Sequence, residues 1–540
     1  MMSALAQRRK IITGRKGHAL VSLVGQHWIP FFVPRVALPP VSAASMPLLI
    51  TLLYGLAALF SAVFGLMELR MLTRFLRHRD AIRSGERWRT NGASGDRAEL
   101  SPTVTIQIPL YNERTSAEQI IRAAAAQNYP RDRFDIQVLD DSTDETSVIV
   151  ARVAEEARDS GLRIEHLRRD ARNGYKAGAL AEGLDRSSSE FVAVFDADFA
   201  PQTGFLKAIL CDADPFADPK VAFVQARWTW GSGEGQNWLA RAMALLLDRH
   251  FRVQKPVQVY LGNVTTFNGS GGIWRRAAID DAGGWASDTL TEDLDLSYRC
   301  ALAGWRGHYL QNVGVLNEVP GHMRALKIQQ RRWAKGTAQC LRKLGRRIMS
   351  SGDVVEDRWE ELFLLAAYAI HPILLASMIL WPWAVLYVDR TLFWVLQAFM
   401  GLGIVTAALT LLVTIHERDH RLSVGALREM VAGLVIGGGL MVNNTVGQVQ
   451  GFLTTGGEFV RTPKRAQAPK GETPSGTGAD RPYSTPLHWT FFAELLGVAY
   501  CVVGAVILIQ QGEALWSLAL ILWGASLGLI VQQQLIPPPA

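Results

Sequence analysis

Pairs of carboxylates at several points of the sequence could together hold a metal-bound diphosphate and remove a proton from a hydroxyl group. Asp196 and Asp198 follow the apolar run 191–195, which is typical of a buried strand. Two carboxylates one residue apart at a strand end can bind a divalent cation, and Mg²⁺ favours one or two carboxylates plus substrate phosphates. A turn or capping pair is the structural alternative, because Asp is common after strands.

A second acidic cluster and a lysine are candidates for contacting a nucleotide. Asp140 closes another apolar run and is the better candidate, whereas Thr143 or Asp144 would cap the helix that follows. Lys176 lies near the predicted N-terminus of a helix and could bind phosphate oxygens. A solvated lysine is the commoner fate of this residue type.

The triplet Thr291-Glu292-Asp293 supplies a candidate general base. Asp293 could take a proton from an attacking hydroxyl, a task suited to a carboxylate in a partly buried cleft. The alternative is structural, with Thr291 capping a helix and the acidic residues complementing its dipole.

Gln329, Arg332 and Trp333 lie in a helical stretch that is rich in basic residues. Trp333 could stack on a sugar while the basic face meets lipid headgroups or pyrophosphate. An amphipathic helix at a membrane surface would explain the same pattern.

The elements that must position these residues alternate between strand and helix patterns. Such alternation predicts a largely parallel sheet with ligands at the carboxyl ends of the strands, where the aspartate motifs lie. We expect strands at 104–109, 135–139, 163–166, 191–195 and 221–225, and helices at 116–127, 144–159 and 175–185.

Apolar stretches on both sides of this region are long enough to cross a bilayer core of about 30 Å. We expect spans at 47–66, 361–387, 392–415, 489–509 and 515–531. The run 431–442 is shorter and is predicted to lie at the membrane interface. The basic loop 461–481 stays on the cytoplasmic side, with the basic cluster after the first span, only if 431–442 does not cross.

Composition excludes several classes of protein. A chain of 540 residues exceeds the limit of roughly 250–300 residues for a single hydrophobic core, so we expect at least two structural units. The net charge of +7 does not indicate nucleic acid, because the basic residues gather beside apolar spans. The four cysteines are scattered, which argues against a zinc site or a disulfide framework.

In their order along the chain, the motifs resemble those of family 2 glycosyltransferases. They are most similar to the processive membrane branch, the cellulose synthases and the cellulose-synthase-like mannan and glucan synthases. The segment 457–464 resembles the gating loop of that branch, with Arg461 where valine is usual. The motifs are Pro109–Glu113, Asp140–Ser142, Lys176–Gly178, Asp196–Asp198, Thr291–Asp293 and Gln329–Trp333.

The resemblance implies a Rossmann-like α/β domain of GT-A fold in the cytoplasm, joined to an α-helical transmembrane region. It implies Mg²⁺ or Mn²⁺ held mainly by Asp198 with Asp196, and inversion at the anomeric carbon with Asp293, beside Glu292, as base. The implied nucleotide-binding residues are Tyr111, Glu113, Asp140, Lys176 and Asp196. The implied acceptor-binding residues are Gln329, Arg332, Trp333, Asn268, Gly269 and Ser270, and the gating-loop residues are Phe459, Thr462 and Lys464.

These inferences divide the chain into nine segments. They are a leader at the interface (1–46), a span (47–66), a basic linker (67–100), the GT-A domain (101–345), a connector (346–360), two spans (361–415), an interfacial helix with the gating-type loop (416–488), two spans (489–531) and a tail (532–540).

The resemblance implies transfer of a hexose from UDP-glucose or GDP-mannose to the non-reducing end of a growing β-glucan or β-mannan, followed by export. We expect a multi-pass protein of the inner (plasma) membrane. Its expected partners are the nucleotide-sugar donor, a glycan or lipid acceptor, membrane lipids and cell-envelope export partners, but no nucleic acid. The alternatives are a non-processive glucosyltransferase acting on ceramide or diacylglycerol, and a membrane scaffold or transporter subunit with an inactive transferase domain.

Overall fold

The computed structural model describes residues 45–84, 101–231, 237–355, 357–460 and 487–536. The predictions for the leader up to residue 44, for 85–100, for the tail from 537 and for Thr462, Lys464 and the rest of the loop 461–486 lie outside these residues.

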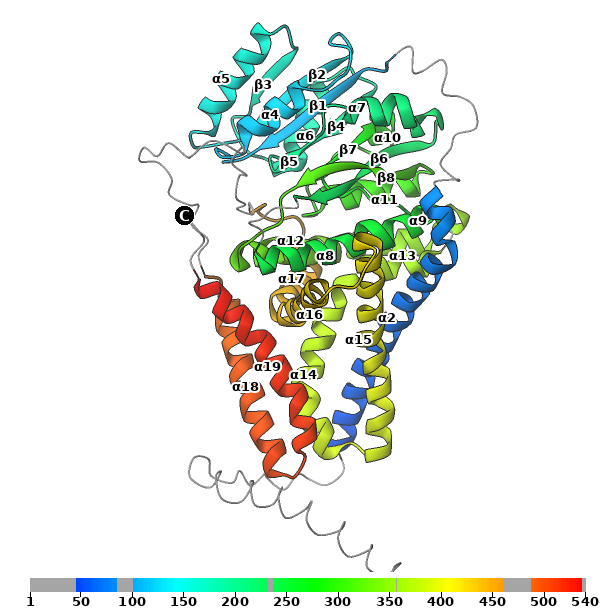
Figure 1. The fold of residues 1–540 in the computed structure, drawn as a ribbon, viewed down its shortest axis with the longest axis vertical. Helices are drawn as coiled ribbons and strands as arrows, with labels where there is room; N and C mark the ends of the chain where they lie inside the picture. Colours follow the sequence, from blue (N-terminus) through cyan, green and yellow to red (C-terminus); the bar gives the residue numbers. More distant parts are fainter. Residues whose placement is uncertain (1–44, 85–100, 232–236, 356, 461–486, 537–540) are drawn as a thin grey trace, which may run out of the picture.

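An eight-stranded mixed sheet forms the part of the molecule farthest from the long helices (Figure 1), with strand order β3-β2-β1-β4-β7-β6-β8-β5. Strands β1 to β4 are mutually parallel, but β7 runs antiparallel to both β4 and β6, and β5 antiparallel to β8. Strands β6 and β8 are parallel to each other and, with β7 reversed between β4 and β6, run in the same direction as β1 to β4. The prediction of a largely parallel sheet is therefore confirmed, with β5 and β7 as the two reversed strands. The strands are β1 (Val104–Leu110), β2 (Phe134–Asp140), β3 (Ile164–Arg168), β4 (Phe191–Val194), β5 (Phe199–Ala200), β6 (Val221–Trp230), β7 (Gly272–Arg275) and β8 (Arg306–Asn317).

Strand β4 shows why a continuous apolar run becomes a buried strand. Phe191 and Ala193 pack in the core on the face that α4 and α5 cover, whereas Val192 and Val194 pack on the opposite face with α6, α10 and α11. Because successive side chains point to opposite faces, a strand covered on both sides must be apolar at every position. These helices are α4 (Ala117–Ala125), α5 (Thr146–Asp159), α6 (Tyr175–Arg186), α10 (Arg276–Asp281) and α11 (Glu292–Leu302).

A layer of helices separates the sheet from the long helices (Figure 1). Its longest member is α12 (Met323–Met349), which carries the predicted acceptor residues and packs along α17. The other helices of this layer are α8 (Trp238–Asp248), α9 (Lys255–Leu261) and α13 (Arg358–Leu365), with a π-helix at Arg249–Gln254 between α8 and α9. The short helix α7 (Phe205–Lys207) packs in the core of the sheet instead.

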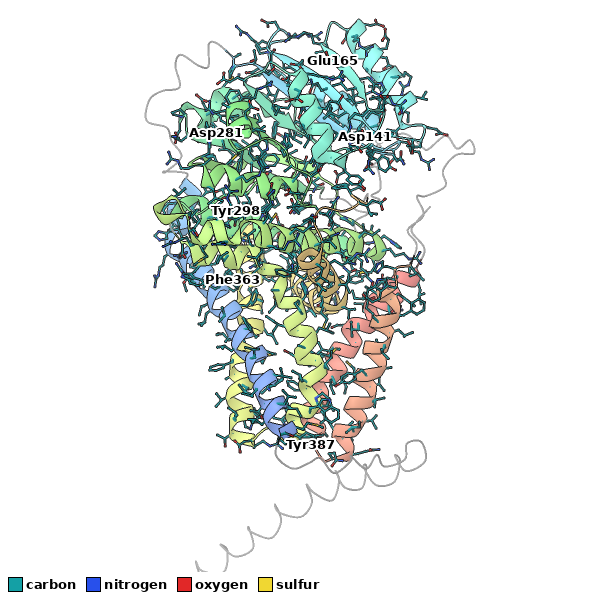
Figure 2. The ribbon with its side chains drawn as sticks, turned by 180° about the vertical axis from the view of Figure 1, so that it is seen from behind. Asp141, Glu165, Asp281, Tyr298, Phe363 and Tyr387 are labelled. Carbon is teal, nitrogen blue, oxygen red and sulfur yellow. The ribbon has the colours of Figure 1, made fainter. Side chains whose placement is uncertain are left out.

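Among the described residues, five helices are long and apolar enough to cross a membrane. Figure 2 shows Tyr387 at the far end of these helices and Tyr298 between them and the sheet. Two further helices, α16 (Val424–Gly439) and α17 (Met441–Leu453), are bent by 49° at their junction and would make a sixth span only if they cross together. The five are α2 (Ser45–Ser84), α14 (Ile370–Tyr387), α15 (Arg390–Asp419), α18 (Thr490–Gln510) and α19 (Ala514–Leu535).

The first long helix continues well past the predicted span. Helix α2 runs through the basic cluster to Ser84, where the sequence suggested a linker from residue 67. Arg70 and Arg74 pair with Asp357 and Glu360 at the start of α13. These partners lie far away in the sequence, so the local pattern could not reveal them.

Candidate active site

The ends of several strands meet at one edge of the sheet. The carboxyl ends of β1, β2 and β4 share this edge because these strands are parallel. Val194, the last residue of β4, pairs with Gly272, the first residue of the antiparallel β7. The residues before β7 therefore lie at the same edge as the aspartates after β4.

A cavity of about 470 Å³ opens at this edge and extends to α12 and α13. It brings together residues from motifs that are nearly 350 positions apart in the sequence. The predicted site residues that line it are Tyr111, Glu113, Lys176, Asp196, Asp198, Asn268, Gly269, Glu292, Asp293, Gln329, Arg332, Trp333 and Phe459.

Lys176 forms the electrostatic centre of the cavity. Its Nζ lies 2.6 Å from Asp196 Oδ1 and 3.5 Å from Glu292 Oε1, and it donates a hydrogen bond to the Gly269 carbonyl (2.8 Å). Burial acts to lower the pKa of Lys176, but the charges of Asp196 and Glu292 outweigh it and raise the pKa. Lys176 is therefore a fixed positive charge among carboxylates.

Asp293 lies at the start of α11, next to the loop before β7. Burial, reinforced by the charge of Glu292, raises the pKa of Asp293 to about 7, whereas Lys176 acts to lower it. Gly269 has φ +79°, and a Cβ there would lie 3.5 Å from Asp293 Oδ2, so this glycine keeps space open beside the carboxylate. A buried carboxylate with a pKa near neutrality is suited to general base catalysis.

The predicted capping role of Thr291 is wrong. Its side chain makes no hydrogen bond to the first turn of α11. Its Oγ1 lies 3.4 Å from Cys340 Sγ on α12 instead. Thr291 therefore joins the loop before the base to α12.

Arg332 reaches from α12 into the cavity and meets the segment that follows α17. Its guanidinium carbon lies 4.0 Å from the centre of the Phe459 ring, within the range of a cation–π contact. Burial lowers the pKa of Arg332, while the charges of Glu292, Asp196 and Asp293 oppose that effect. Arg332 and Lys176 are thus two of the four basic side chains that line the cavity, with Arg172 and Arg249.

The expectation that Asp140 contacts the nucleotide does not agree with the structure, because Asp141 lines the cavity in its place. Asp140 Oδ2 lies 2.9 Å from His166 Nε2, and Oδ1 accepts a hydrogen bond from the Ser142 amide (2.9 Å). Burial acts to raise the pKa of Asp140, but the hydrogen bonds from His166 and Ser142 prevail and hold it at about 2. Asp140 thus fixes the loop after β2.

Ser270 also lies behind the cavity wall. It is fully buried, and its hydroxyl accepts a hydrogen bond from the Asp196 amide (2.9 Å). Its carbonyl accepts hydrogen bonds from Gln225 Nε2 (3.0 Å) and Trp228 Nε1 (3.1 Å). Ser270 therefore holds the loop that carries Asp196, whereas Asn268 and Gly269 line the cavity.

The sequence motifs missed several residues that line the cavity. Arg172 lies over the Tyr111 ring, 3.4 Å from its centre, and could have been found from its place in the Lys176 stretch. His250, Gln258 and Tyr368 also line the cavity, but they come from helical segments that match none of the motifs. Burial lowers the pKa of His250 to about 3, so this imidazole is neutral.

A divalent cation fits the residues at the end of β4. Among the described residues, no group of three or more His, Cys, Asp or Glu side chains could enclose a metal ion. Asp196 and Asp198 alone are what Mg²⁺ or Mn²⁺ needs when substrate phosphates supply the other ligands. Asp196 and Asp198 are therefore the residues that would hold such a cation.

The part of the chain that contains the sheet is similar to known proteins. A family described as glycosyltransferase-like family 2 matches residues 102–336. Glucomannan 4-beta-mannosyltransferase 9 of Arabidopsis thaliana is 39% identical over 284 residues, 52% of each chain. Glucomannan 4-beta-mannosyltransferase 1 of Oryza sativa subsp. japonica is 35% identical over 321 residues, 58% of this chain and 60% of its own. The chain thus matches about half the length of these curated relatives.

Among solved structures, a mannosyltransferase from Pyrobaculum calidifontis in complex with GDP-Man and Mn²⁺ is 20% identical, with a TM-score of 0.45. The similarity covers 69% of this chain and 99% of that one. The sheet domain has a GT-A-like fold with a mixed sheet. By sequence, residues 102–336 are similar to the family described as glycosyltransferase-like family 2.

Proposed function

We propose that this protein is an inverting, metal-dependent glycosyltransferase that extends a β-glycan. It would move a hexose from GDP-mannose or UDP-glucose to the non-reducing end of a growing mannan or glucan. The observation that carries the proposal is the single cavity that joins Lys176, Asp198, Asp293 and Trp333. The names of the curated relatives, glucomannan 4-beta-mannosyltransferases, support a mannose or glucose donor.

The donor would occupy the side of the cavity next to β1 and β2. Tyr111, with Arg172 over its ring, and Asp141 would contact the nucleoside. Asp198, with Asp196, would hold Mg²⁺ or Mn²⁺ against the diphosphate. The cation supplies charge stabilisation to the departing diphosphate, and Lys176 adds a fixed positive charge on the protein side.

The acceptor would approach from α12. Trp333 would stack on its terminal sugar, and Gln329, Asn268 and Gly269 line the same space. Asp293 would take the proton of the attacking hydroxyl group while the hydroxyl oxygen forms a bond to the anomeric carbon. The bond from that carbon to the phosphate oxygen breaks, and the nucleoside diphosphate leaves with inversion of configuration.

The position of the cavity also supports a role at the membrane. Its walls include Leu364 and Tyr368, next to the start of α14. We place the catalytic domain in the cytoplasm, the long helices in the plasma membrane among its lipids, and α16 with α17 at the interface. The product would leave through the helices toward export partners in the cell envelope.

The test is a donor panel on the purified full chain in detergent. GDP-mannose, UDP-glucose and UDP-N-acetylglucosamine are each supplied with Mg²⁺, with Mn²⁺ or with a chelator, and the products undergo linkage analysis. A metal-dependent polymer of β-linked mannose or glucose is the expected result. A single sugar on ceramide or diacylglycerol would replace the proposal with the lipid-transferase alternative, and no donor consumption at all would favour an inactive scaffold.

A further inference from the structure

We propose that Gln339, on α12, is a positioning residue that fixes the loop before Asp293 relative to the segment that carries Phe459. This inference rests on the proposed function, since it assigns Gln339 its effect through the base. Gln339 does not line the cavity, so it would act only through the backbone that it holds.

The side chain of Gln339 joins two segments that are distant in the sequence. It is 1% exposed. Its Oε1 accepts a hydrogen bond from the Leu290 amide (2.9 Å), and its Nε2 donates to the carbonyls of Gly456 (2.7 Å) and Thr454 (3.2 Å). Because an amide N–H can only donate and a carbonyl can only accept, the carboxamide has one possible orientation.

The two segments also contact each other directly. The Gly456 amide donates a hydrogen bond to the Asp288 carbonyl (2.6 Å). Gly456 has φ +56°, and a Cβ there would lie 3.0 Å from the Ser287 carbonyl oxygen. The positive φ and the short approach both favour glycine at this position. Gln339 adds hydrogen bonds to a contact that the two backbone segments already make.

Both segments reach the cavity within three residues further along the chain. Leu290 is followed by Thr291, Glu292 and Asp293, and these residues line the cavity. Gly456 is followed by Phe459, whose ring lies under Arg332. A shift of either segment would therefore change the geometry around the base or around the guanidinium.

Helix α12 itself connects these groups. Arg332 and Gln339 lie about two turns apart on it. Between them, Gly336 has no side chain, and a Cβ there would lie 2.5 Å from Thr291 Cγ2. The loop before the base is thus packed directly on the helix that supplies Arg332. Gln339 adds the hydrogen bonds that set its register.

The experiment compares Gln339→Leu and Gln339→Glu with the wild type in the purified full chain. The first substitution removes all three hydrogen bonds; the second keeps the acceptor for the Leu290 amide and loses both N–H donors. With GDP-mannose or UDP-glucose, whichever donor the wild type consumes, Gln339→Leu should lower kcat by about 10- to 100-fold, because small misplacements of catalytic groups cost that much. The donor KM should change by less than about threefold, because Lys176 and Asp198 are held by other elements.

Gln448→Leu is the matched control. Gln448 is also a buried carboxamide, and its Nε2 donates to the Ala334 carbonyl on α12 (2.7 Å) without touching the base loop. It should lower thermal stability as much as Gln339→Leu while leaving kcat within about threefold of the wild type. An equal loss of kcat in both variants, or no loss in Gln339→Leu, would overturn the inference.

Hydrogen exchange gives a readout that does not need activity. In Gln339→Leu, the peptides covering 286–293 and 452–460 should both exchange faster than in the wild type. In Gln339→Glu, only the peptide covering 452–460 should exchange faster. In Gln448→Leu, exchange of both peptides should be unchanged. If the wild type consumed no donor, the proposed function would be wrong. The exchange rates of the two peptides would still show whether Gln339 connects the loop before Asp293 to the segment that carries Phe459. Unchanged exchange in both peptides of Gln339→Leu would refute it.

Discussion

The ammonium nitrogen of Lys176 lies 2.6 Å from Asp196 Oδ1, which ties the first turn of α6 to the end of β4. Lys176 is also held by the Gly269 carbonyl, in the loop before β7. The ammonium group of Lys176 thus connects the elements that are expected to hold the phosphate, the metal ion and the acceptor. Its removal should affect the binding of the donor before anything else.

Lys176→Met keeps the length of the side chain and removes its charge. We expect the donor KM to rise by about tenfold or more, since a hydrogen bond to a charged group is worth about 1.5–3 kcal/mol. Initial rates across a range of donor concentrations measure this. Lys207→Met, at an exposed lysine of α7, is the control, and an unchanged KM in Lys176→Met would contradict a role in phosphate binding.

Asp293→Asn keeps the shape of the side chain and removes the base. We expect kcat to fall by about 10²- to 10⁴-fold, the usual contribution of general base catalysis, with little change in the donor KM. Asp280→Asn, at an exposed site of α10, should behave like the wild type. Transfer at the normal rate in Asp293→Asn would exclude Asp293 as the base.

The raised pKa of Asp293 predicts a pH dependence on the acidic side. A base must be deprotonated to act, so activity should be full well above a pKa of about 7 and should be lost as the pH falls through it. About one pH unit below the pKa, roughly a tenth of the maximal rate should remain. The residual activity of Asp293→Asn, measured over the same pH range, should not show this fall toward acidic pH.

A buried ion pair fastens the C-terminal helical hairpin to α12. Lys327 Nζ lies 2.7 Å from Glu494 Oε1 on α18 and donates to Gln534 Oε1 on α19 (2.7 Å). Glu494→Leu should lower the free energy of unfolding by about 3–5 kcal/mol, because it leaves a buried ammonium without its counter-charge.

Thermal denaturation in detergent measures this effect. The double variant Lys327→Met/Glu494→Leu removes both charges and should regain much of the lost stability. A double variant that is less stable than Glu494→Leu would show that the pair does not behave as a single unit.

The sequence predicted the elements whose pattern is local. Strands β1, β2 and β4 were found because their residues are apolar throughout, and the motifs lie at their ends as expected. Strand β7 was missed because four residues after a glycine-rich loop carry no clear period. Its antiparallel direction is nevertheless what brings Asn268 to the site.

The choice between Asp140 and Asp141 shows a second limit. Neighbouring residues at a strand end point in different directions, and only the partner of each side chain decides which one faces the ligand. His166, on the neighbouring strand β3, forms a hydrogen bond with Asp140. That contact joins residues 26 positions apart, and the composition of either strand does not show it.

The cavity wall is shared among parts of the chain that are usually regarded as separate. Leu364, Tyr368 and Phe459 follow the sheet domain in the sequence, yet they complete the space around the base. Trimming this chain at residue 355 would remove one side of the cavity.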